Sequence, residues 1–490
     1  MFFWDGAWCP PTALVFSATA FLFFFLPVTI ALYAIAPHRF RNGLLLAASW
    51  LFYLWGGGRF TFILLGSTVV NWLLGLLADE GWQLGKPRLR TLAIAIAAVF
   101  NLVLLAYFKY ANFLVDQLRF FGGLDLTWTP VLLPIGISFF TFQSLSYVVD
   151  VARGAAPVQR RWDDLALYVV FFPQLIAGPI VRYQDIAAQL QGRSHRWDQV
   201  TRGMLRFAHG LVKKVLIADS VGRLADAAFG APAELTGSAA WLGLAAYTLQ
   251  IYFDFSGYSD MAIGLGRIFG FRLPENFCRP YCALSVTDFW RRWHITLSHW
   301  FRDYVYIPLG GSRGSGVQIY RNLGIVFLLT GIWHGANWTF ILWGVFHGAL
   351  LILERGFGWR LVQPDPTMPL AAIAGRRALT LLLVCLGWVL FRAPDLSSAL
   401  EYYQALGRFG DGFGLSDAIA TEATGMALAA IAIGSVLALW PTQISAGRFL
   451  DWSPSWAAVG MRLGTACVTF PLALMLSVAN NFSPFLYFQF

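Results

Sequence analysis

The chain has 490 residues, of which 58% are hydrophobic and only 12% are charged. Soluble domains carry about 25% charged residues, so this composition excludes an ordinary soluble protein, a disordered chain and a disulfide-rich scaffold, and its long apolar runs predict an all-α polytopic membrane protein rather than a β-barrel. The net charge of +9 does not indicate nucleic-acid binding, because the basic residues lie in short loops beside apolar runs, as the positive-inside rule predicts.

The first apolar run, residues 14–36, is long enough to cross a bilayer. No basic stretch precedes it, so we expect no cleavable signal peptide. His38, Arg39 and Arg41 follow it directly, which places the N-terminus outside the cytoplasm. We expect about eleven transmembrane helices, because further apolar segments lie at 43–55, 60–78, 91–114, 131–149, 165–181, 205–229, 239–263, 322–353, 378–391, 426–440 and 462–479.

Some of these segments are not simple spans. Segment 165–181 contains Pro173, Gly178 and Pro179, which favours a re-entrant or tilted piece that is buried in protein. The loops with the most arginine and lysine, expected in the cytoplasm, are 79–90, 153–161, 182–206 and 267–321. Loop 392–425 carries two arginines against five acids, and we therefore expect it outside the cytoplasm.

The segment 322–353 holds 32 residues without an Asp, Glu, Lys or Arg. As one straight helix it would be about 48 Å long, whereas the hydrocarbon core is about 30 Å thick, so it must tilt, overhang or break. Gly331 and Gly335 allow a break beside His334. An ionisable residue at this depth marks a functional site, and histidine suits a general base. The alternative is a buried histidine that only bonds a neighbouring helix. His347 in the same run lacks the combination of neighbouring glycine, tryptophan and asparagine residues that His334 has, and we regard it as structural.

The stretch 267–321 has eight arginines and three acids. Its core, residues 288–304, interleaves tryptophans with arginines, which is typical of an amphipathic helix at a membrane interface. A second interpretation adds an anionic ligand, with a phosphate held by Arg291, Arg292 and Arg302. His294 then acts as a second catalytic or donor-orienting group. His294 and His299 are five residues apart and on different helix faces, so we expect no metal site.

A third polar feature, residues 252–260, lies at the end of an apolar segment. Asp254, Ser256 and Asp260 need partners at this depth. Together with Asn337, they are candidates to line a polar tunnel. The other interpretation is that the two acids form structural pairs with the arginines that follow. The five cysteines include no CxxC pair, so neither a disulfide framework nor a zinc site is indicated.

An ordered set of short motifs resembles the membrane-bound O-acyltransferase (MBOAT) family, and within it the bacterial alginate O-acetylation branch. The similarity runs nearly from end to end and rests on the motifs at 15–17, 134–139, 172–180, 254–260, 291–294, 306–311, 333–335 and 484–488. Each motif alone is weak, whereas the ordered set is specific. The resemblance implies a single transmembrane domain over residues 1–490, with the core motifs at about 130–355, folded as a helical funnel.

The same resemblance implies acyl transfer to a hydroxyl, with His334 matching the family's essential histidine and His294 the second histidine of the bacterial branch. It implies acetyl-CoA as a cytoplasmic donor, no tightly bound cofactor, and an extracytoplasmic SGNH-hydrolase-like partner that completes transfer to an exported polysaccharide such as alginate. The location expected is the bacterial inner membrane. Peptidoglycan, teichoic acid or cellulose are alternative acceptors. A polysaccharide or lipid-linked-sugar transporter is the rival from another class, although we find no inverted repeat.

Overall fold

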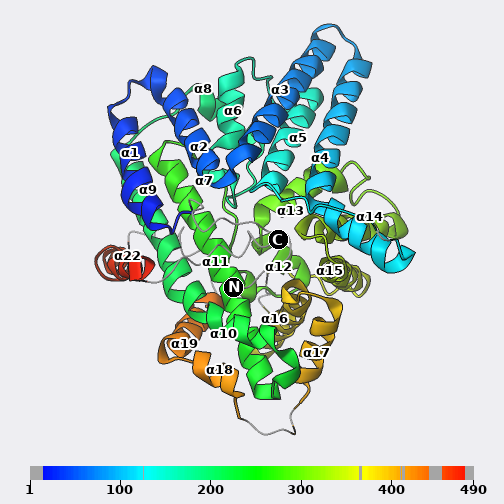
Figure 1. The fold of residues 1–490 in the computed structure, drawn as a ribbon, viewed down its shortest axis with the longest axis vertical. Coiled ribbons are helices and arrows are strands. Elements are labelled where there is room, and N and C mark those ends of the chain that lie inside the picture. The colour runs from blue at the N-terminus through cyan, green and yellow to red at the C-terminus, as the bar shows by residue number, and fades with distance from the viewer. Residues whose placement is uncertain are drawn as a thin grey trace. The chain divides into compact units, whose positions relative to one another are not determined.

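The structure is a computed structural model that describes residues 15–124, 126–363, 367–408, 410, 414–440 and 455–479. The described residues form helices and connecting loops, without a strand (Figure 1). The chain divides into two compact units, one of Met1–Ala208, Tyr258–Pro274 and Leu474–Phe490, and one of His209–Gly257 and Glu275–Ala473. Helices α9 (Trp197–Val212) and α11 (Gly237–Ile268) contribute residues to both units.

In the first unit, helices α3, α4 and α5 pack on one another, and α2 packs on α6. Asn71 on α3 and Asn101 on α4 are buried and exchange amide hydrogen bonds of 3.3 and 2.8 Å, which satisfies two polar groups in an apolar contact. The helices of this unit are α1 (Leu26–Ile35, after the π-turn Phe21–Phe25), α2 (Arg41–Gly57), α3 (Thr61–Gln83), α4 (Pro87–Gly122), α5 (Ile137–Arg153), α6 (Trp162–Val170), α7 (Phe172–Leu175) and α8 (Tyr183–Gln191).

The expected burial of segment 165–181 in protein is confirmed in this unit, whereas its re-entrant or tilted path stays a prediction. The segment consists of α6 and the single turn α7, which are separated at Phe171, and Pro173 lies in the first turn of α7. All of its residues are buried in protein. Non-helical backbone is tolerated in a membrane protein only where protein or water covers it, so this burial explains why the Pro- and Gly-rich sequence is accommodated.

The second unit holds most of the polar motifs. Its packing includes contacts of α14 with α15, α12 with α15, and α15 with α16. Its helices, besides parts of α9 and α11, are α10 (Asp219–Gly230), α12 (Val286–Arg292), α13 (Ile295–Phe301), α14 (Gly316–His334), α15 (Trp338–Gly356), α16 (Leu370–Arg392), α17 (Leu396–Leu406), α18 (Asp417–Glu422), α19 (Gly425–Leu439) and α21 (Trp456–Gly464). Helix α22 (Phe470–Ala479) spans the division between the units.

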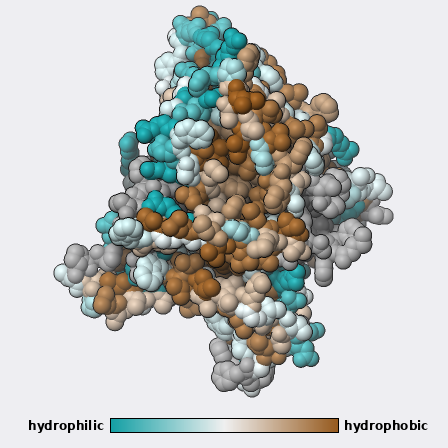
Figure 2. Space-filling view, turned by 90° about the vertical axis from the view of Figure 1, so that its left-hand side faces the viewer, coloured by the Kyte–Doolittle hydropathy of each residue, from teal (hydrophilic) through white to brown (hydrophobic). Residues whose placement is uncertain are grey.

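Five helical segments in the described residues are long and apolar enough to cross a membrane. They are His38–Gln83, Pro87–Gly122, Trp338–Gly356, Leu370–Arg392 and Trp456–Ala479, and Phe21–Ile35 and Gly425–Leu439 are shorter apolar helices. Figure 2 shows a face on which hydrophobic residues cover a broad area. Helices with large exposed apolar surface belong in a bilayer. The chain is a multi-pass membrane protein, and the count of eleven spans stays a prediction.

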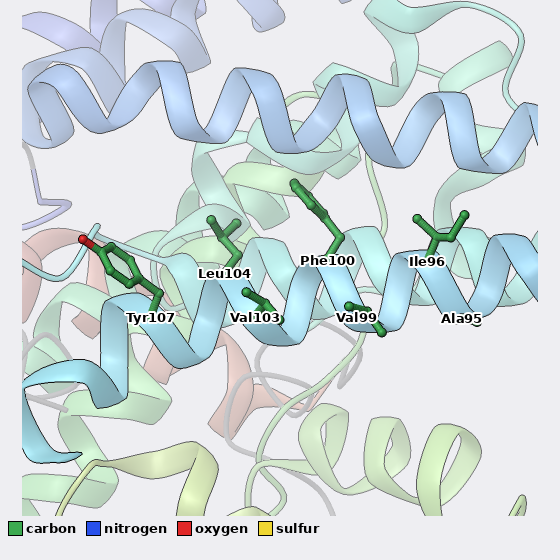
Figure 3. A pocket seen from close by; sticks show the side chains of 7 residues that line it. All are labelled: Ala95, Ile96, Val99, Phe100, Val103, Leu104 and Tyr107. Atoms are coloured by element: carbon green, nitrogen blue, oxygen red, sulfur yellow. The ribbon is translucent and has the colours of Figure 1, made fainter.

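Helix α4 illustrates such a lipid-facing surface. Figure 3 shows a hollow lined by seven residues of this one helix: Ala95, Ile96, Val99, Phe100, Val103, Leu104 and Tyr107. Its volume is about 640 Å³, and its lining is almost wholly apolar. It lacks the convergent polar groups that binding sites for polar substrates carry, so we assign this surface to contact with lipid chains.

Of the three possibilities for segment 322–353, which were a tilt, an overhang or a break, the structure shows the break. Helix α14 ends at His334, α15 begins at Trp338, and residues 335–337 form the connection. The two helices form an antiparallel hairpin, since Gly331 meets Gly344 and Phe340 while Gly348 meets Phe327. An added Cβ at Gly335 would collide with the Phe340 ring. The 32-residue run is therefore two helices joined by a tight turn, and not one overlong span.

The close approach of these helices predicts a strong effect at Gly344. A Cβ there would collide with the Phe327 carbonyl oxygen and lie 3.1 Å from the Gly331 Cα. We expect Gly344→Val to lower the melting temperature of the detergent-solubilised protein sharply, by overpacking on the order of 1–3 kcal/mol or more. The matched control is Gly324→Ala on α14, where an added Cβ meets nothing within 4 Å. Equal melting temperatures for the two variants would contradict the hairpin.

Candidate functional site

His334 is the last residue of α14, and Gly335 follows it as the C-cap. The side chain is buried, with 3% of its surface exposed. The rings of Trp333, Trp343 and Phe391 surround it, with centroids 4.9, 5.0 and 5.0 Å from the imidazole centroid. Three helices thus surround one imidazole: α14, α15 and α16. This enclosure fits a base that works in a water-poor site.

His294 lies between α12 and α13 with φ of 42°, a left-handed conformation that is unusual outside glycine. Its side chain is fully buried. Its Nδ1–H donates to Asn276 Oδ1 at 3.1 Å, and the same oxygen accepts from the Thr296 hydroxyl at 2.9 Å. Since Asn276 thereby fixes the tautomer, Nε2 is the basic nitrogen. Burial lowers the pKa of the His294 imidazole to about 3, so the ring is neutral at pH 7.

Trp333 connects the two histidines that the sequence singled out. Its ring centroid lies 6.2 Å from that of His294 and 4.9 Å from that of His334. The structure therefore brings both candidate catalytic histidines against one indole. Residues 40 positions apart meet here because the loop after α11 folds the α12–α13 region beside α14.

The expectation of one amphipathic interfacial helix over residues 288–304 is wrong. The stretch is two short helices, α12 and α13, broken at Trp293 and His294. Trp290, Trp293 and Trp300 are all buried and pack against other rings of the unit. The break occurs because His294 adopts a left-handed conformation, and the tryptophans contribute to the protein core instead of an exposed aromatic belt.

A basic pocket of about 500 Å³ lies beside α12 and α13. Four arginines line it, and no carboxylate does; the full lining is Thr287, Trp290, Arg291, Ile295, Ser298, His299, Arg302, Tyr306, Ser312, Leu323, Leu351, Arg355 and Arg360. Guanidinium groups and hydroxyls of this kind suit a phosphate-bearing ligand. We call this cavity the arginine pocket.

The three arginines proposed from sequence are not equivalent. Arg291 and Arg302 line the arginine pocket, whereas Arg292 is absent from its lining. Arg292 Nε instead donates to the buried Asp288 carboxylate at 2.8 Å. Arg302 pairs with its neighbour Asp303 at 2.7 Å, and half of its side chain is exposed.

Arg355, Arg360 and the carboxylate of Glu354, which orders this region, were not predicted from the sequence. Glu354 accepts hydrogen bonds from the backbone N–H groups of Val286 and Thr287 and from the Thr287 hydroxyl, the last two at 2.9 Å. It thereby joins the end of α15 to the first turn of α12, where negative charge is favourable. The spacing of Leu351 and Arg355 on one face of α15 was the signal that could have revealed the contribution of this helix.

The two acids of residues 252–260 form buried ion pairs. Asp254 pairs with Lys214 at 2.8 Å, and Asp260 pairs with Arg206 at 2.6 Å. Structural pairing is thus observed, with basic residues that precede the acids in the chain. Ser256 is also buried. Asn337 is the N-cap of α15, where its side chain accepts from Thr339 N–H and donates to the Pro394 carbonyl. A tunnel role for these four stays a prediction.

Comparison with known proteins agrees with this arrangement. Residues 163–392 match the model of the MBOAT, membrane-bound O-acyltransferase, family. The chain is 43% identical to a protein named probable alginate O-acetylase AlgI from Pseudomonas putida, over 97% of this chain and 100% of the relative. It is 42% identical, over the same shares, to the protein of that name from Pseudomonas aeruginosa. The chain belongs to the membrane-bound O-acyltransferase family. A peptidoglycan O-acetyltransferase from Helicobacter pylori is 36% identical over 80% of each chain.

The region matched to the MBOAT model contains His294, His334 and the whole arginine pocket. The chain is therefore an O-acyltransferase whose buried histidines and basic cavity lie in the part that defines the family. The MBOAT motif expected at residues 484–488 lies outside the described residues.

Proposed function

We propose that this MBOAT enzyme moves an acetyl group from acetyl-CoA toward the O-acetylation of exported alginate. The observation that carries the proposal is the pairing of an enclosed histidine, His334, with a basic pocket on the same unit. Relatives named for alginate O-acetylation match at 42–43% identity over nearly the whole chain, which supports alginate as the polymer. Peptidoglycan is the second candidate, because the Helicobacter pylori relative also matches over most of the chain.

His334 acts as the general base in this proposal. A thioester already has a good leaving group, so the enzyme must mainly place a hydroxyl and remove its proton as the acyl bond forms. The surrounding rings exclude water and so protect the thioester from hydrolysis. His294, held in one tautomer by Asn276, orients the reacting groups across Trp333. The proton taken from the hydroxyl finally reaches the departing thiolate, which balances the reaction.

Donor recognition is assigned to the arginine pocket. CoA carries phosphates, and Arg291 faces the pocket whereas Arg292 is held by Asp288. We therefore expect Arg291→Ala to raise the KM for acetyl-CoA roughly ten- to a hundred-fold, equivalent to about 1.5–3 kcal/mol, with a smaller change in kcat. Steady-state kinetics at matched protein level measure this. Arg302→Ala is expected to have a smaller effect because of its pairing with Asp303. An unchanged donor KM in Arg291→Ala would show that the pocket binds something else.

The proposed orientation of the protein in the membrane rests on the net charge of its loops. We propose that the protein resides in the bacterial inner membrane with residues 267–321 in the cytoplasm, the N-terminus and loop 392–425 outside, and an SGNH-hydrolase-like protein as its extracytoplasmic partner. The first stretch carries a net charge of +5 and the loop −3. A topology reporter fused after Gly314 should give a cytoplasmic signal, and one fused after Gly412 an external signal. Signals from the same side would overturn this orientation.

The choice of polymer is tested by deleting the gene. Mass spectrometry of the isolated polymers should show loss of acetyl groups from exported alginate, with peptidoglycan acetylation unchanged. Loss from peptidoglycan alone would replace alginate with the second candidate.

A further inference from the structure

In the first unit, two arginines lie beside the end of α1. Arg41 is the first residue of α2, and Arg193 lies in the loop that follows α8. Both guanidinium groups lie near the ring of Tyr33 on α1, at 5.1 and 6.0 Å from the ring centroid. We call Arg41 and Arg193 the arginine pair. Two distant parts of the sequence thus place two positive charges beside one aromatic ring.

The hydrogen bonds of the arginine pair go to neutral groups. Arg41 donates to the Ala36 carbonyl at 3.1 Å and to an imidazole nitrogen of His38 at 3.3 Å. Arg193 donates to a tyrosine hydroxyl, to backbone carbonyls and to an asparagine side chain. Neither arginine pairs with a carboxylate among the residues that the structure describes. Both side chains are only partly exposed, and charges in such places are normally paired.

Other arginines of the same unit have the acidic partners that this pair lacks. Asp164, the acid that the hydrogen bonds come nearest to, accepts from the Asn42 amide at 2.8 Å and lies 3.3 Å from Arg161. Ion pairs with aspartates are formed by Arg160, Arg161 and Arg182. The positive charge of the arginine pair is therefore left without an acid that directly offsets it.

His195 lies beside the arginine pair and responds to its charge. Its Nε2 is 2.6 Å from the Tyr33 hydroxyl. The loop can approach this closely because Gly270 has no side chain: a Cβ there would lie 2.9 Å from the same nitrogen. Burial, followed by the charges of Arg41 and Arg193, lowers the pKa of the imidazole to about 4. The positive potential here is strong enough to oppose a further positive charge, and it favours an anion.

Large exposed apolar side chains close to the pair in the sequence indicate what kind of anion fits. Ile35 ends the apolar helix α1, Phe40 precedes α2, and Trp197 begins α9. Their exposed fractions are 79%, 56% and 84%. Tryptophan beside apolar helices is typical of the headgroup level of a membrane. Basic side chains at this level attract anionic lipids, whereas a soluble anion needs no apolar surroundings.

We propose that the arginine pair binds the headgroup phosphate of an anionic phospholipid such as phosphatidylglycerol. Guanidinium groups match the geometry of phosphate oxygens. Phosphatidylcholine carries the same phosphate together with a positive ammonium group, so it binds this site more weakly. The site lies in the first unit, apart from the arginine pocket of the second unit, and does not depend on the identity of the acyl donor or acceptor.

Native mass spectrometry of the full-length, detergent-purified protein tests the proposal with dioleoylphosphatidylglycerol and dioleoylphosphatidylcholine. We expect Arg41→Gln and Arg193→Gln each to weaken binding of phosphatidylglycerol roughly fivefold and to leave that of phosphatidylcholine unchanged. The matched control is Arg160→Gln, which removes an arginine that already has an acidic partner and should bind both lipids like wild type. Glycerophosphoglycerol, the same headgroup without acyl chains, should bind far more weakly than the lipid.

Wild-type affinity for phosphatidylglycerol in a folded Arg41→Gln protein would overturn the proposal, and so would equal affinity of the wild type for the two lipids. Glycerophosphoglycerol that binds as tightly as the lipid would show a site for a soluble anion and would also overturn it. Thermal unfolding establishes that each variant is folded. If Arg193→Gln does not fold, Arg41→Gln carries the comparison, with Arg41→Lys expected to retain part of the affinity.

Discussion

Replacing His334 with glutamine is expected to abolish acyl transfer while the protein still inserts and folds. Loss of a general base typically costs a factor of about 10²–10⁴ in rate. The folded state should survive because glutamine retains hydrogen-bonding groups at the end of α14, where the neighbouring Trp333, Trp343 and Phe391 rings remain. The measurement is turnover of the purified variant at saturating donor, alongside its elution profile in size-exclusion chromatography.

The matched control for this variant is His38→Gln, which changes an exposed histidine in the first unit. It should retain wild-type turnover. Wild-type acetylation by a normally folded His334→Gln protein would show that another group removes the hydroxyl proton.

Breaking the buried ion pair of Arg206 is expected to cause the largest loss of stability. Its guanidinium lies 2.6 Å from Asp260, and the two side chains are 1% and 7% exposed. Around this pair, α9 and α11 approach closely, since an added Cβ at Gly203 would lie 2.7 Å from the Gly264 carbonyl oxygen. Arg206→Ala leaves a carboxylate in this tight contact, at a cost of about 3–5 kcal/mol. Thermal unfolding in detergent should show a large drop in melting temperature.

The control for charge is Arg196→Ala, which removes an ion pair with Asp198 whose side chains are 70% and 46% exposed. Exposed pairs contribute about 0–1 kcal/mol, so this variant should unfold close to wild type. The double variant Arg206→Met/Asp260→Leu should recover much of the stability lost in Arg206→Ala, because both charges are then absent. Equal melting temperatures for Arg206→Ala and Arg196→Ala would contradict the burial of the pair.

Features governed by chain geometry could be predicted from the sequence. The run 322–353 was too long for one span, and the structure breaks it between His334 and Trp338. Pro173 and the glycine near it indicated a broken buried segment, and residues 165–181 form one. Helix length, bilayer thickness and the conformational preferences of proline and glycine suffice for such predictions, since they are local.

Features that depend on tertiary contacts could not be predicted. Asp254 and Asp260 pair with Lys214 and Arg206, residues 40 and 54 positions earlier. An ion pair between residues so far apart in the sequence leaves no signal in residue spacing. Similarly, nothing local distinguishes Arg291, which lines the pocket, from Arg292, which pairs with Asp288. The interfacial helix was mispredicted because tryptophans beside arginines are typical of both a membrane interface and a protein core.

The central claim is that His334 acts as the general base while an acetyl group moves from acetyl-CoA toward an exported hydroxyl, and it is tested most directly in sealed inverted membrane vesicles. [¹³C]acetyl-CoA is supplied to the exposed cytoplasmic face, and the label on alginate inside the vesicles is measured by mass spectrometry. The account predicts label with the wild-type protein and its loss with His334→Gln at equal protein level. Label of equal amount with both proteins would contradict it.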